Sequence, residues 1–245
     1  MFFLKSKKIP LTDIFFEGFV DIHSHLLPGI DDGAKDLEDS IALISKMSSY
    51  GIKKFITTPH VLGDVYPNSS KLILEKLSEV KDELKKRQML DINIKASAEY
   101  MLDEQFCKLL ENDDILVLKD NLILVEMSYF NAPYNLYEII FDILNKGYKP
   151  ILAHPERYNF YHDDFQNYYK LKKAGCLFQL NLLSLTEQYG KGVQKTAEKL
   201  VKENLYDFVG TDTHHNRHLN LLKTIGNKKT KDKISYLVGK NSFFN

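Results

Sequence analysis

Two histidines, His23 and His25, are separated by one residue in a stretch whose apolar and polar residues alternate as in a β-strand. Successive strand side chains point to opposite faces, so both imidazoles would leave on the same face. The following loop, residues 27–33, is kept non-helical by Pro and Gly and can bring Asp32 back over the strand end. Two imidazoles and a carboxylate suit a divalent metal ion. So short a pattern also occurs by chance, and the other strand ends must decide.

Metal-ligand residue types recur at the ends of the other strands that the sequence predicts. Alternating or continuous apolar runs indicate strands over residues 20–25, 54–60, 92–99, 122–126, 149–154, 176–181 and 206–214. The candidate ligands at these ends, with one from the first loop, are His23, His25, His60, Glu99, Glu126, His154, Asp212, His214 and Asp32. Each alone is more simply a capped or solvated side chain. Chance would have to explain the same placement on six of the seven strands, so we favour a metal site.

The number and type of these ligands limit the ions that they could hold. One ion uses about four to six ligands, so nine predict two or three divalent ions that share bridging carboxylates. Cys107 and Cys176 have no nearby Cys partner, and without thiolates the ions should be manganese, iron or zinc. A cysteine-dependent tyrosine phosphatase would need an Arg six residues after its Cys, but Asp113 and Leu182 occupy these positions.

The strands that carry the candidate ligands alternate with helices. Residues 37–47 show helical spacing, for example, with Asp36 as N-cap and Gly51 as the stop. Seven strand–helix units of about 30 residues each predict an α/β fold, a seven-stranded (β/α)7 barrel with its active site at the carboxyl ends of the strands. An open doubly wound sheet is the alternative, but it would gather ligands at one switch point. We expect one domain over residues 19–245 and an N-terminal extension, residues 1–18, whose aromatic cluster 14–16 packs outside the barrel.

Composition and charge narrow the possible partners and the compartment. Lys+Arg and Asp+Glu are both 33, so no overall basic field would attract nucleic acid or an anionic membrane. Two cysteines cannot form a disulfide framework, which indicates a reducing cytoplasm. The N-terminus is apolar first and charged second, the reverse of a signal peptide, and no apolar run reaches membrane-spanning length. A cytoplasmic protein without membrane insertion is expected.

The arginines point to phosphate. The chain has only Arg87, Arg157 and Arg217, and the last two each follow a candidate metal ligand by three positions. Arginine suits bidentate phosphate binding, so we expect Arg157 and Arg217 to act as a catalytic phosphate clamp and Arg87, within a basic run, to be a surface charge. A flat apolar slot for a tyrosyl ring could come from Tyr66, Tyr129, Phe130 and Tyr158, although ordinary packing explains these residues equally well.

Taken together, the motifs resemble those of the PHP (polymerase and histidinol phosphatase) superfamily. The matching segments are 21–25 (DIHSH), 58–60 (TPH), 154–157 (HPER) and 211–214 (TDTH), with Glu99 and Glu126 between them. More closely, segments 23–33 (HSHLLPGIDDG) and 154–158 (HPERY) are similar to bacterial manganese-dependent protein-tyrosine phosphatases of capsule and exopolysaccharide operons, the CpsB/YwqE type. The resemblance covers about residues 19–240. The extension and the tail from residue 238 lie outside it or match poorly.

The resemblance implies a distorted seven-stranded barrel with a trinuclear, most typically manganese, site. It assigns three ligand sets, which are His23, His25, Glu99 and Asp212; Glu99, Glu126 and His154; and Asp32, His60 and His214. The implied activity is hydrolysis of phosphotyrosine by metal-activated water, on the Tyr-rich tail of a membrane tyrosine autokinase that regulates capsule synthesis. The alternatives are a small-molecule phosphoesterase of the histidinol phosphate type, a nuclease, which neutral charge disfavours, and a non-catalytic domain stabilised by metals.

Overall fold

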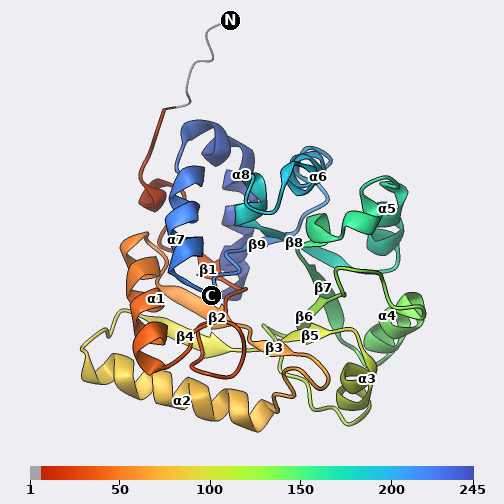
Figure 1. Cartoon of the computed structure of the whole chain (residues 1–245), viewed down its shortest axis with the longest axis horizontal. Coiled ribbons are helices and arrows are strands. Elements are labelled where there is room, and N and C mark those ends of the chain that lie inside the picture. Colours follow the sequence, from red (N-terminus) through yellow and green to blue (C-terminus); the bar gives the residue numbers. More distant parts are fainter. Residues whose placement is uncertain (1–6) are drawn as a thin grey trace, which may run out of the picture.

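The computed structural model describes residues 7–245, and its strands form two parallel sheets in the middle of the fold (Figure 1). The smaller sheet has the order β1-β2-β4, with bounds Val20–Asp21, Lys54–Thr57 and Asn93–Ala96. The larger has the order β3-β5-β6-β7-β8-β9, with bounds His60–Val61, Glu99–Met101, Leu122–Glu126, Lys149–Ala153, Leu177–Asn181 and Phe208–Gly210. The α/β class with parallel strands is as expected, whereas a single closed seven-stranded sheet is not what the pairing shows.

The difference arises because two predicted strands are each broken in the middle. The expected strand 54–60 becomes β2 and β3, and the strand 92–99 becomes β4 and β5. Pro59 has no N–H to donate, so the ladder stops after Thr57 pairs with Ala96 and resumes where the Glu99 N–H donates to the Pro59 carbonyl. Each half then belongs to a different sheet.

The first and last predicted strands are also shorter than expected, but hydrogen bonds continue beyond them. The His25 N–H donates to Thr213 O, and the Asp212 N–H donates to His23 O. Ser24 and Thr213 form an isolated parallel bridge. The chain past β1 therefore stays extended and lies beside the chain past β9, which places the two sheets edge to edge.

Helices cover the outside of both sheets (Figure 1). Their bounds are Leu37–Ser49 (α1), Ser70–Lys86 (α2), Glu104–Glu111 (α3), Leu136–Asn145 (α4), Gln166–Lys173 (α5), Lys191–Lys202 (α6), Asn216–Leu222 (α7) and Lys228–Lys240 (α8). The expected cap of α1 is confirmed, since Asp36 accepts a hydrogen bond from Asp39 N, and Gly51 follows the helix at φ 96°. No helix within residues 7–245 has both the length and the apolar character needed to cross a membrane.

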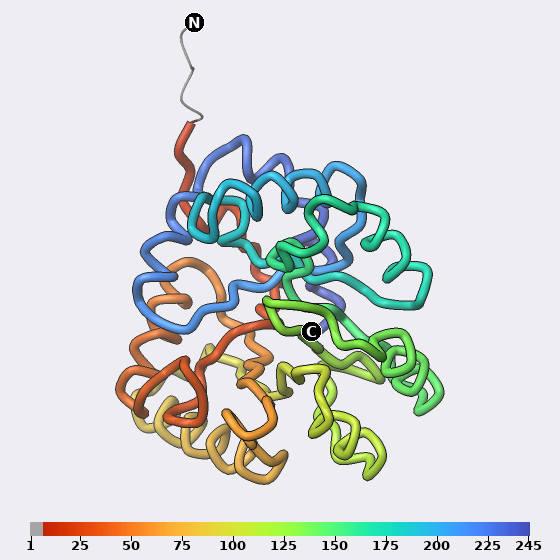
Figure 2. The backbone as a smooth tube through the Cα atoms, turned by 45° about the vertical axis from the view of Figure 1, so that its right-hand side comes forward, coloured from red at the N-terminus to blue at the C-terminus, as the bar shows by residue number. Residues whose placement is uncertain are grey.

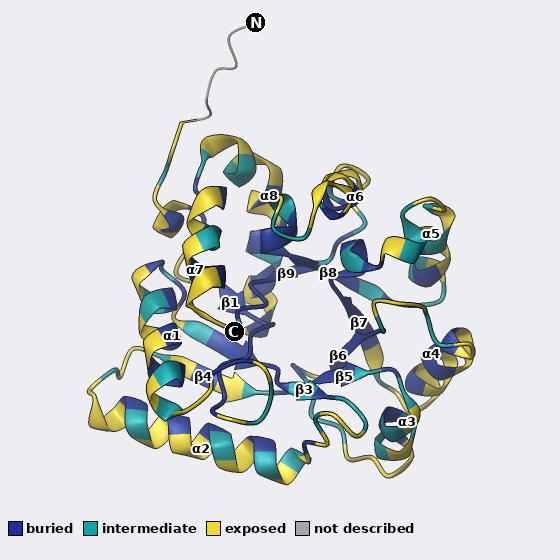
Figure 3. Cartoon of the chain, viewed as in Figure 1, coloured by how far each residue is buried: buried dark blue, intermediate teal, exposed yellow. Residues whose placement is uncertain are grey.

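Buried residues form two clusters, and Figure 3 shows the strands as the most deeply buried part of the fold. The larger cluster lies between strands and helices. The smaller one combines residues of both sheets with one from the C-terminal end, namely Val20, Ile22, Ile56, Leu118, Leu122, Leu124, Ile151, Ala153, Phe208 and Phe244. The two sheets therefore share an apolar interior.

The C-terminal end covers this interior at the amino ends of the strands. A short 3-10 helix, η6 (Asn241–Phe244), buries Phe244 against Phe208, and both Figures 1 and 2 project the C-terminal end onto the middle of the fold. The Asn241 side chain donates to the carbonyls of Val20 and Val209 and accepts from Val209 N. This tail is thus an integral part of the core.

The expected N-terminal extension is described in part, because residues 1–6 lie outside the described range. Lys8 bridges to Asn227, just before α8. Ile14 and Phe15 of the aromatic cluster are buried, whereas Phe16 is exposed. Ile14 and Phe15 therefore belong to the larger buried cluster, and the predicted place of the aromatic cluster outside a barrel stays a prediction.

Candidate metal centre

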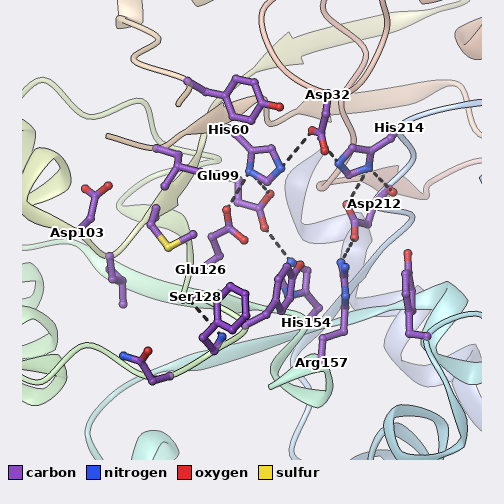
Figure 4. A pocket seen from close by; sticks show the side chains of 18 of the residues that line it. Asp32, His60, Glu99, Asp103, Glu126, Ser128, His154, Arg157, Asp212 and His214 are labelled. Carbon is purple, nitrogen blue, oxygen red and sulfur yellow. Dashed lines mark hydrogen bonds and ion pairs between the residues drawn. The ribbon is translucent and has the colours of Figure 1, made fainter. Parts of the chain in front are cut away.

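The nine predicted ligands converge at the carboxyl ends of the strands. Figure 4 shows those that line the cavity, namely Asp32, His60, Glu99, Glu126, His154, Asp212 and His214. Within the described residues, their donor atoms form four overlapping groups, and the atoms of each group lie within 4.8 Å of one another. The groups are His25, Asp32, His60 and His214; His23, His154 and Asp212; His23, His25 and Glu99; and His60, Glu99 and Glu126. All nine residues lie at strand ends or in the first loop, and the structure brings them together in one region.

Four side chains drawn from two of these groups, His23, His25, Glu99 and Asp212, have the spacing expected of ligands to one ion. His23 Nε2 lies 3.1 Å from Glu99 Oε2, and both His23 Nε2 and His25 Nε2 lie 3.4 Å from Asp212 Oδ1. Two ligands about 2.1 Å from one ion, at a tetrahedral angle, are about 3.4 Å apart. The four side chains are fully or almost fully buried. These atoms therefore match the first ligand set implied by the resemblance.

The other donors surround Glu99 and Asp32. Glu99 Oε1 lies 3.0 Å from His154 Nε2, while Glu99 Oε2 lies 3.2 Å from His60 Nδ1. His60 Nε2 faces the other way, 3.5 Å from Asp32 Oδ1. Asp32 Oδ1 in turn lies 3.4 Å from His214 Nε2. Glu99 thus presents its two oxygens to different donors, as a bridging carboxylate does.

Buried polar atoms of this cluster that lack a hydrogen bond fit a bound cation. Glu99 Oε2, His60 Nδ1 and His154 Nδ1 are buried and have no hydrogen-bond partner of good geometry among the described residues. Buried polar atoms are nearly always satisfied, and an unexplained exception points to a missing water or ion. Burial opposes the charge of Glu99, but His23 and His60 hold its pKa well below its usual range. An ionised carboxylate among imidazole nitrogens fits a divalent ion.

Side chains behind the cluster fix which imidazole nitrogen faces it. His23 Nδ1 lies 2.8 Å from Gln179 Oε1, and His25 Nδ1 lies 2.8 Å from Asp31 Oδ2. These contacts leave both Nε2 atoms turned toward Glu99 and Asp212, as in metal sites whose histidines are held by an outer partner. Sequence analysis missed both roles.

The loop that carries Asp31 is held close to the cluster. Asp31 also accepts from the backbone N–H groups of Gly33 and His60, which ties the loop to β3. A Cβ at position 33 would lie 2.3 Å from the His25 carbonyl oxygen, so only glycine allows this approach.

Arg157 lies beside the cluster in a fixed position. It belongs to the 3-10 helix η2 (Pro155–Arg157), directly after β7, and its Nη1 donates to Asp212 Oδ2 over 2.8 Å. Its guanidinium carbon lies 4.6 Å from the ring centre of Tyr129 and 4.3 Å from that of Tyr189. Asn181 Nδ2 donates to the same Asp212 oxygen and to the Tyr189 hydroxyl. Arg157 therefore lies close to two aromatic rings, and Asp212 is the one hydrogen-bond acceptor found for its guanidinium among the described residues.

The structure does not bring Arg217 to the same place. It lies on α7 with an exposed side chain and is not among the residues that line the cavity at the cluster. Arg87 is also a surface residue, which pairs with Glu38 and Glu83. Of the three arginines, Arg157 alone lines that cavity, and the clamp role of Arg217 stays a prediction without structural support.

Two of the candidate ligands have an uncommon backbone. His154 has φ 34° and Asp212 has φ 49°, both in the left-handed region that non-glycine residues rarely adopt. Such residues cost on the order of 1–3 kcal/mol each and cluster at functional sites. In both cases the residue lies directly after or close to the end of a strand, where the turn aims its side chain at the cluster.

A cavity of about 710 Å³ opens above the cluster. Tyr66, Tyr129 and Phe130 line it, as predicted for an aromatic slot. Tyr158 does not, since it is fully buried with its hydroxyl bonded to Met127 N and Ala153 O. The lining also includes polar residues that sequence analysis did not single out, namely Asp103, Ser128, Asn131, His215 and His218.

The two cysteines take no part in this cavity. Neither Cys107 nor Cys176 is among its lining residues. Burial raises the pKa of the Cys107 thiol and raises that of the Cys176 thiol to about 12. Both thiols are therefore protonated at neutral pH, which agrees with the exclusion of a cysteine nucleophile from the sequence.

Comparison with known proteins identifies the relatives of this chain. The family model for capsular polysaccharide synthesis, CpsB/CapC, matches residues 19–241. A putative tyrosine-protein phosphatase CapC from Staphylococcus aureus is 30% identical over 217 residues, 86% of this chain and 84% of the relative. The tyrosine-protein phosphatase YwqE of Bacillus subtilis is 29% identical over 228 residues, 91% of this chain and 89% of the relative.

Solved structures agree with this result. A crystal structure from work on YwqE of Bacillus subtilis and CpsB of Streptococcus pneumoniae, described as metal-dependent tyrosine phosphatases, superposes with a TM-score of 0.81 at 28% identity and covers 91% of this chain and 92% of the other. A histidinol phosphate phosphatase from Lactococcus lactis shares the fold, with a TM-score of 0.55 at 13% identity over 88% of this chain and 94% of the other. The family match over residues 19–241 shows that the chain belongs to the CpsB/CapC family of capsular polysaccharide synthesis proteins.

Proposed function

We propose that this protein is a metal-dependent protein-tyrosine phosphatase, a phosphoric monoester hydrolase. The observation that carries the proposal is the convergence of nine metal-type side chains and one stacked arginine on a single cavity. Relatives named as tyrosine-protein phosphatases cover most of the chain and support the same activity. No protein nucleophile is needed, which fits the raised pKa values of both thiols.

We further propose that the cluster holds two or three divalent ions, with manganese first and iron or zinc as alternatives. His23, His25, Glu99 and Asp212 would bind one; Glu99, Glu126 and His154 a second; and Asp32, His60 and His214 a third. Bound ions of this kind supply a water of lowered pKa and neutralise charge on phosphoryl oxygens. The donors are all nitrogen or oxygen, which suits these metals.

The role we propose for Arg157 is to orient the phosphoryl group. Its Nη1 is committed to Asp212, while the rest of its N–H edge can face an anion in the cavity. Stacking on Tyr129 and Tyr189 limits the rotation of the guanidinium, so little conformational entropy is lost when phosphate binds. A lysine at this position would keep the positive charge but would lack the planar, two-pronged fit of the guanidinium.

The aromatic wall supports a tyrosyl substrate. Tyr66 stacks on His60 with ring centres 5.8 Å apart, and Tyr129 and Phe130 form another part of the lining. A phenyl ring could pass between these side chains while its phosphate reaches the cluster. The likeness to a histidinol phosphate phosphatase is one of fold alone and gives no support to that small substrate.

We also propose that the two sheets are parts of one distorted seven-stranded barrel of the PHP type. The shared apolar interior and the hydrogen bonds between the segments past β1 and β9 support this arrangement. The physiological substrate that we propose is the Tyr-rich tail of a membrane tyrosine autokinase, met in the cytoplasm. Support for this partner comes from the family resemblance and not from any contact in the structure.

A comparison of substrates with and without metal tests the proposal. Metal-stripped protein should be inactive on p-nitrophenyl phosphate, and added manganese should restore turnover. With manganese, a phosphotyrosyl peptide should be hydrolysed well, a phosphoseryl peptide poorly and histidinol phosphate hardly at all. A clear preference for histidinol phosphate would assign the protein to the small-molecule phosphoesterases, and metal-independent turnover would remove the metal role.

A further inference from the structure

Helix α4 is apolar on two faces, which is unusual for a helix on the surface of a fold. Its inner face buries Leu136, Ile139, Ile140 and Ile143. Its outer face carries Tyr137, Phe141 and Leu144 at positions i, i+4 and i+7, all of them exposed, with Phe141 62% exposed. Tyr134 precedes them with the same spacing and is fully exposed. We call the four exposed residues Tyr134, Tyr137, Phe141 and Leu144 the aromatic ridge.

The aromatic ridge is continuous with the wall of the cavity. The loop from β6 to α4, residues 127–135, lines the cavity through Tyr129, Phe130, Asn131 and Pro133. Phe130 is 91% exposed although it belongs to this lining. The next residue after Pro133 is Tyr134, where the ridge begins. An apolar path therefore leads from the cavity mouth onto the outer face of α4.

Other parts of the lining are polar or mixed. Asp32 and His215 are exposed residues of the lining, on the segments that follow β1 and β9. Toward β3 and β5 the lining combines Asp103 with the apolar residues Leu62 and Met101. A polypeptide that leaves the cavity over residues 127–135 meets Tyr129 and Phe130 and then, directly after Pro133, the aromatic ridge.

We propose that the aromatic ridge binds the polypeptide that flanks the phosphotyrosine of a protein substrate, through apolar side chains of that segment. The inference rests on the proposed phosphatase function. A phosphotyrosine whose phosphate reaches the buried cluster must leave its own chain at the cavity mouth, beside Phe130. From Tyr137 to Leu144 the helix rises about 10 Å, which an extended segment of about three residues would span.

Such a surface would give the enzyme selectivity among phosphotyrosyl proteins without any change in its chemistry. Exposed aromatic rings supply most of the binding energy in many recognition surfaces, and a short apolar segment can bind to them with few hydrogen bonds. The contribution would appear in KM for polypeptides and not in the turnover of small esters, because small esters do not reach α4.

The test compares three manganese-loaded reactions of the double variant Tyr137→Ser/Phe141→Ser. The probes are a phosphotyrosyl peptide with Leu and Phe four to eight residues from the phosphotyrosine, the same peptide with Ser at those positions, and p-nitrophenyl phosphate. We expect kcat/KM for the apolar peptide to fall about tenfold, mainly through KM, with the other two unchanged. The matched control, Leu90→Ser/Tyr236→Ser, removes exposed apolar side chains elsewhere and should leave all three rates as in wild type.

Several results would overturn this inference. One is an unchanged rate on the apolar peptide, and another is an equal fall on all three probes. A variant that turns a wild-type dimer into a monomer in sedimentation velocity, with the peptide rates unaltered, would assign the ridge to a second copy of the chain instead. Wild-type protein that hydrolyses none of the three probes with manganese would reject the phosphatase function itself, and this inference with it.

Discussion

The two ends of the strands are built in opposite ways. At the carboxyl ends, five imidazoles and four carboxylates crowd together, and Glu99 Oε2 and His60 Nδ1 have close neighbours but no hydrogen bond of good geometry among the described residues. At the amino ends, Phe244 closes an apolar interior, and both polar atoms of the Asn241 side chain are fully used by backbone groups. At the amino ends, the polar groups of Asn241 find their hydrogen-bond partners within the fold. At the carboxyl ends, the polar atoms of the cluster would need a bound ion to complete their interactions.

This contrast separates the parts of the chain that hold the fold from the parts that do chemistry. Burying polar atoms without hydrogen bonds costs stability, and at the carboxyl ends a bound ion would offset that cost. Changes at the carboxyl ends should therefore affect activity more than stability, and changes at the amino ends should do the reverse. Four predictions test this division, from the largest expected effect to the smallest.

Loss of a central ligand should nearly abolish turnover while the fold survives. In manganese, Glu99→Gln and His154→Ala should each lower kcat on p-nitrophenyl phosphate by about 10³-fold or more, which corresponds to about 4 kcal/mol. Glu99 faces several imidazoles, so its loss disturbs more than one proposed ion. Far-UV circular dichroism should stay as in wild type. Near-normal turnover in either variant would contradict the metal assignment.

Removal of the Phe244 ring at the amino ends of the strands should lower stability and leave activity unchanged. Phe244→Ala removes a fully buried ring and should lower the free energy of unfolding by about 3 to 5 kcal/mol, measured by urea denaturation. The kcat/KM of the folded protein should not change. Phe243→Ala is the matched control, because the neighbouring ring is 45% exposed and should cost much less. Equal losses for the two variants, or a lower kcat for Phe244→Ala, would erase the division between the two ends.

Arg157 should matter for catalysis through its shape as well as its charge. Arg157→Ala should lose about 2 to 4 kcal/mol of transition-state stabilisation, as removal of one electrostatic donor typically does, and Arg157→Lys should also be defective. Inorganic phosphate should become a weaker competitive inhibitor of both variants. Arg87→Ala should match wild type, and the exposed position of Arg217 predicts little effect of Arg217→Ala. A loss at Arg217 as large as that at Arg157 would restore the two-arginine clamp.

The smallest effect concerns the ring that holds Arg157. Tyr189→Leu removes one of the two rings beside Arg157 and should cost about 1 kcal/mol of transition-state stabilisation, seen as a lower kcat/KM that comes mainly from a higher KM. Inorganic phosphate should also inhibit this variant less. Tyr189→Phe keeps the stack and should restore most of the loss. This result would show that the Tyr189 hydroxyl, which accepts a hydrogen bond from Asn181, contributes less to the position of Arg157 than the ring does. If Phe rescues nothing, the hydrogen bond and not the stacking positions the arginine.

The candidate ligands could be predicted because strand periodicity and the carboxyl-end rule both act locally. The loop residue shows where this stops. Asp31 and Asp32 are adjacent and equally suited to a metal, yet Asp31 binds His25 and Asp32 faces His60 and His214. Only the folded loop shows that Asp31 contacts an imidazole from behind, whereas Asp32 faces the candidate metal cluster.

Other roles depended on contacts between distant segments. Gln179 and Asn181 lie two residues apart in a buried strand, so both side chains point to the same face. Two polar residues on one buried face indicate polar partners there, which here are His23 and Asp212. Tyr189 lies in a loop without periodicity, so nothing in the sequence indicated that it stacks on Arg157. The burial of Phe244 against Phe208 likewise depends on tertiary packing, so the local sequence of the C-terminal segment does not predict it. Pro59 indicates a break in the strand, because proline has no N–H to donate. Nothing local to Pro59 indicates that the chain moves to a different sheet after the break.

The left-handed backbone at His154 and Asp212 places this enzyme family member under two conflicting demands. Glycine would relieve the backbone strain at both positions, yet it would delete a side chain of the cluster and, at position 212, would remove the acceptor of Arg157 and Asn181. Relief of strain and loss of a candidate ligand are therefore the same change at these sites. Engineering that aims only at a relaxed backbone would tend to remove the chemistry along with the strain.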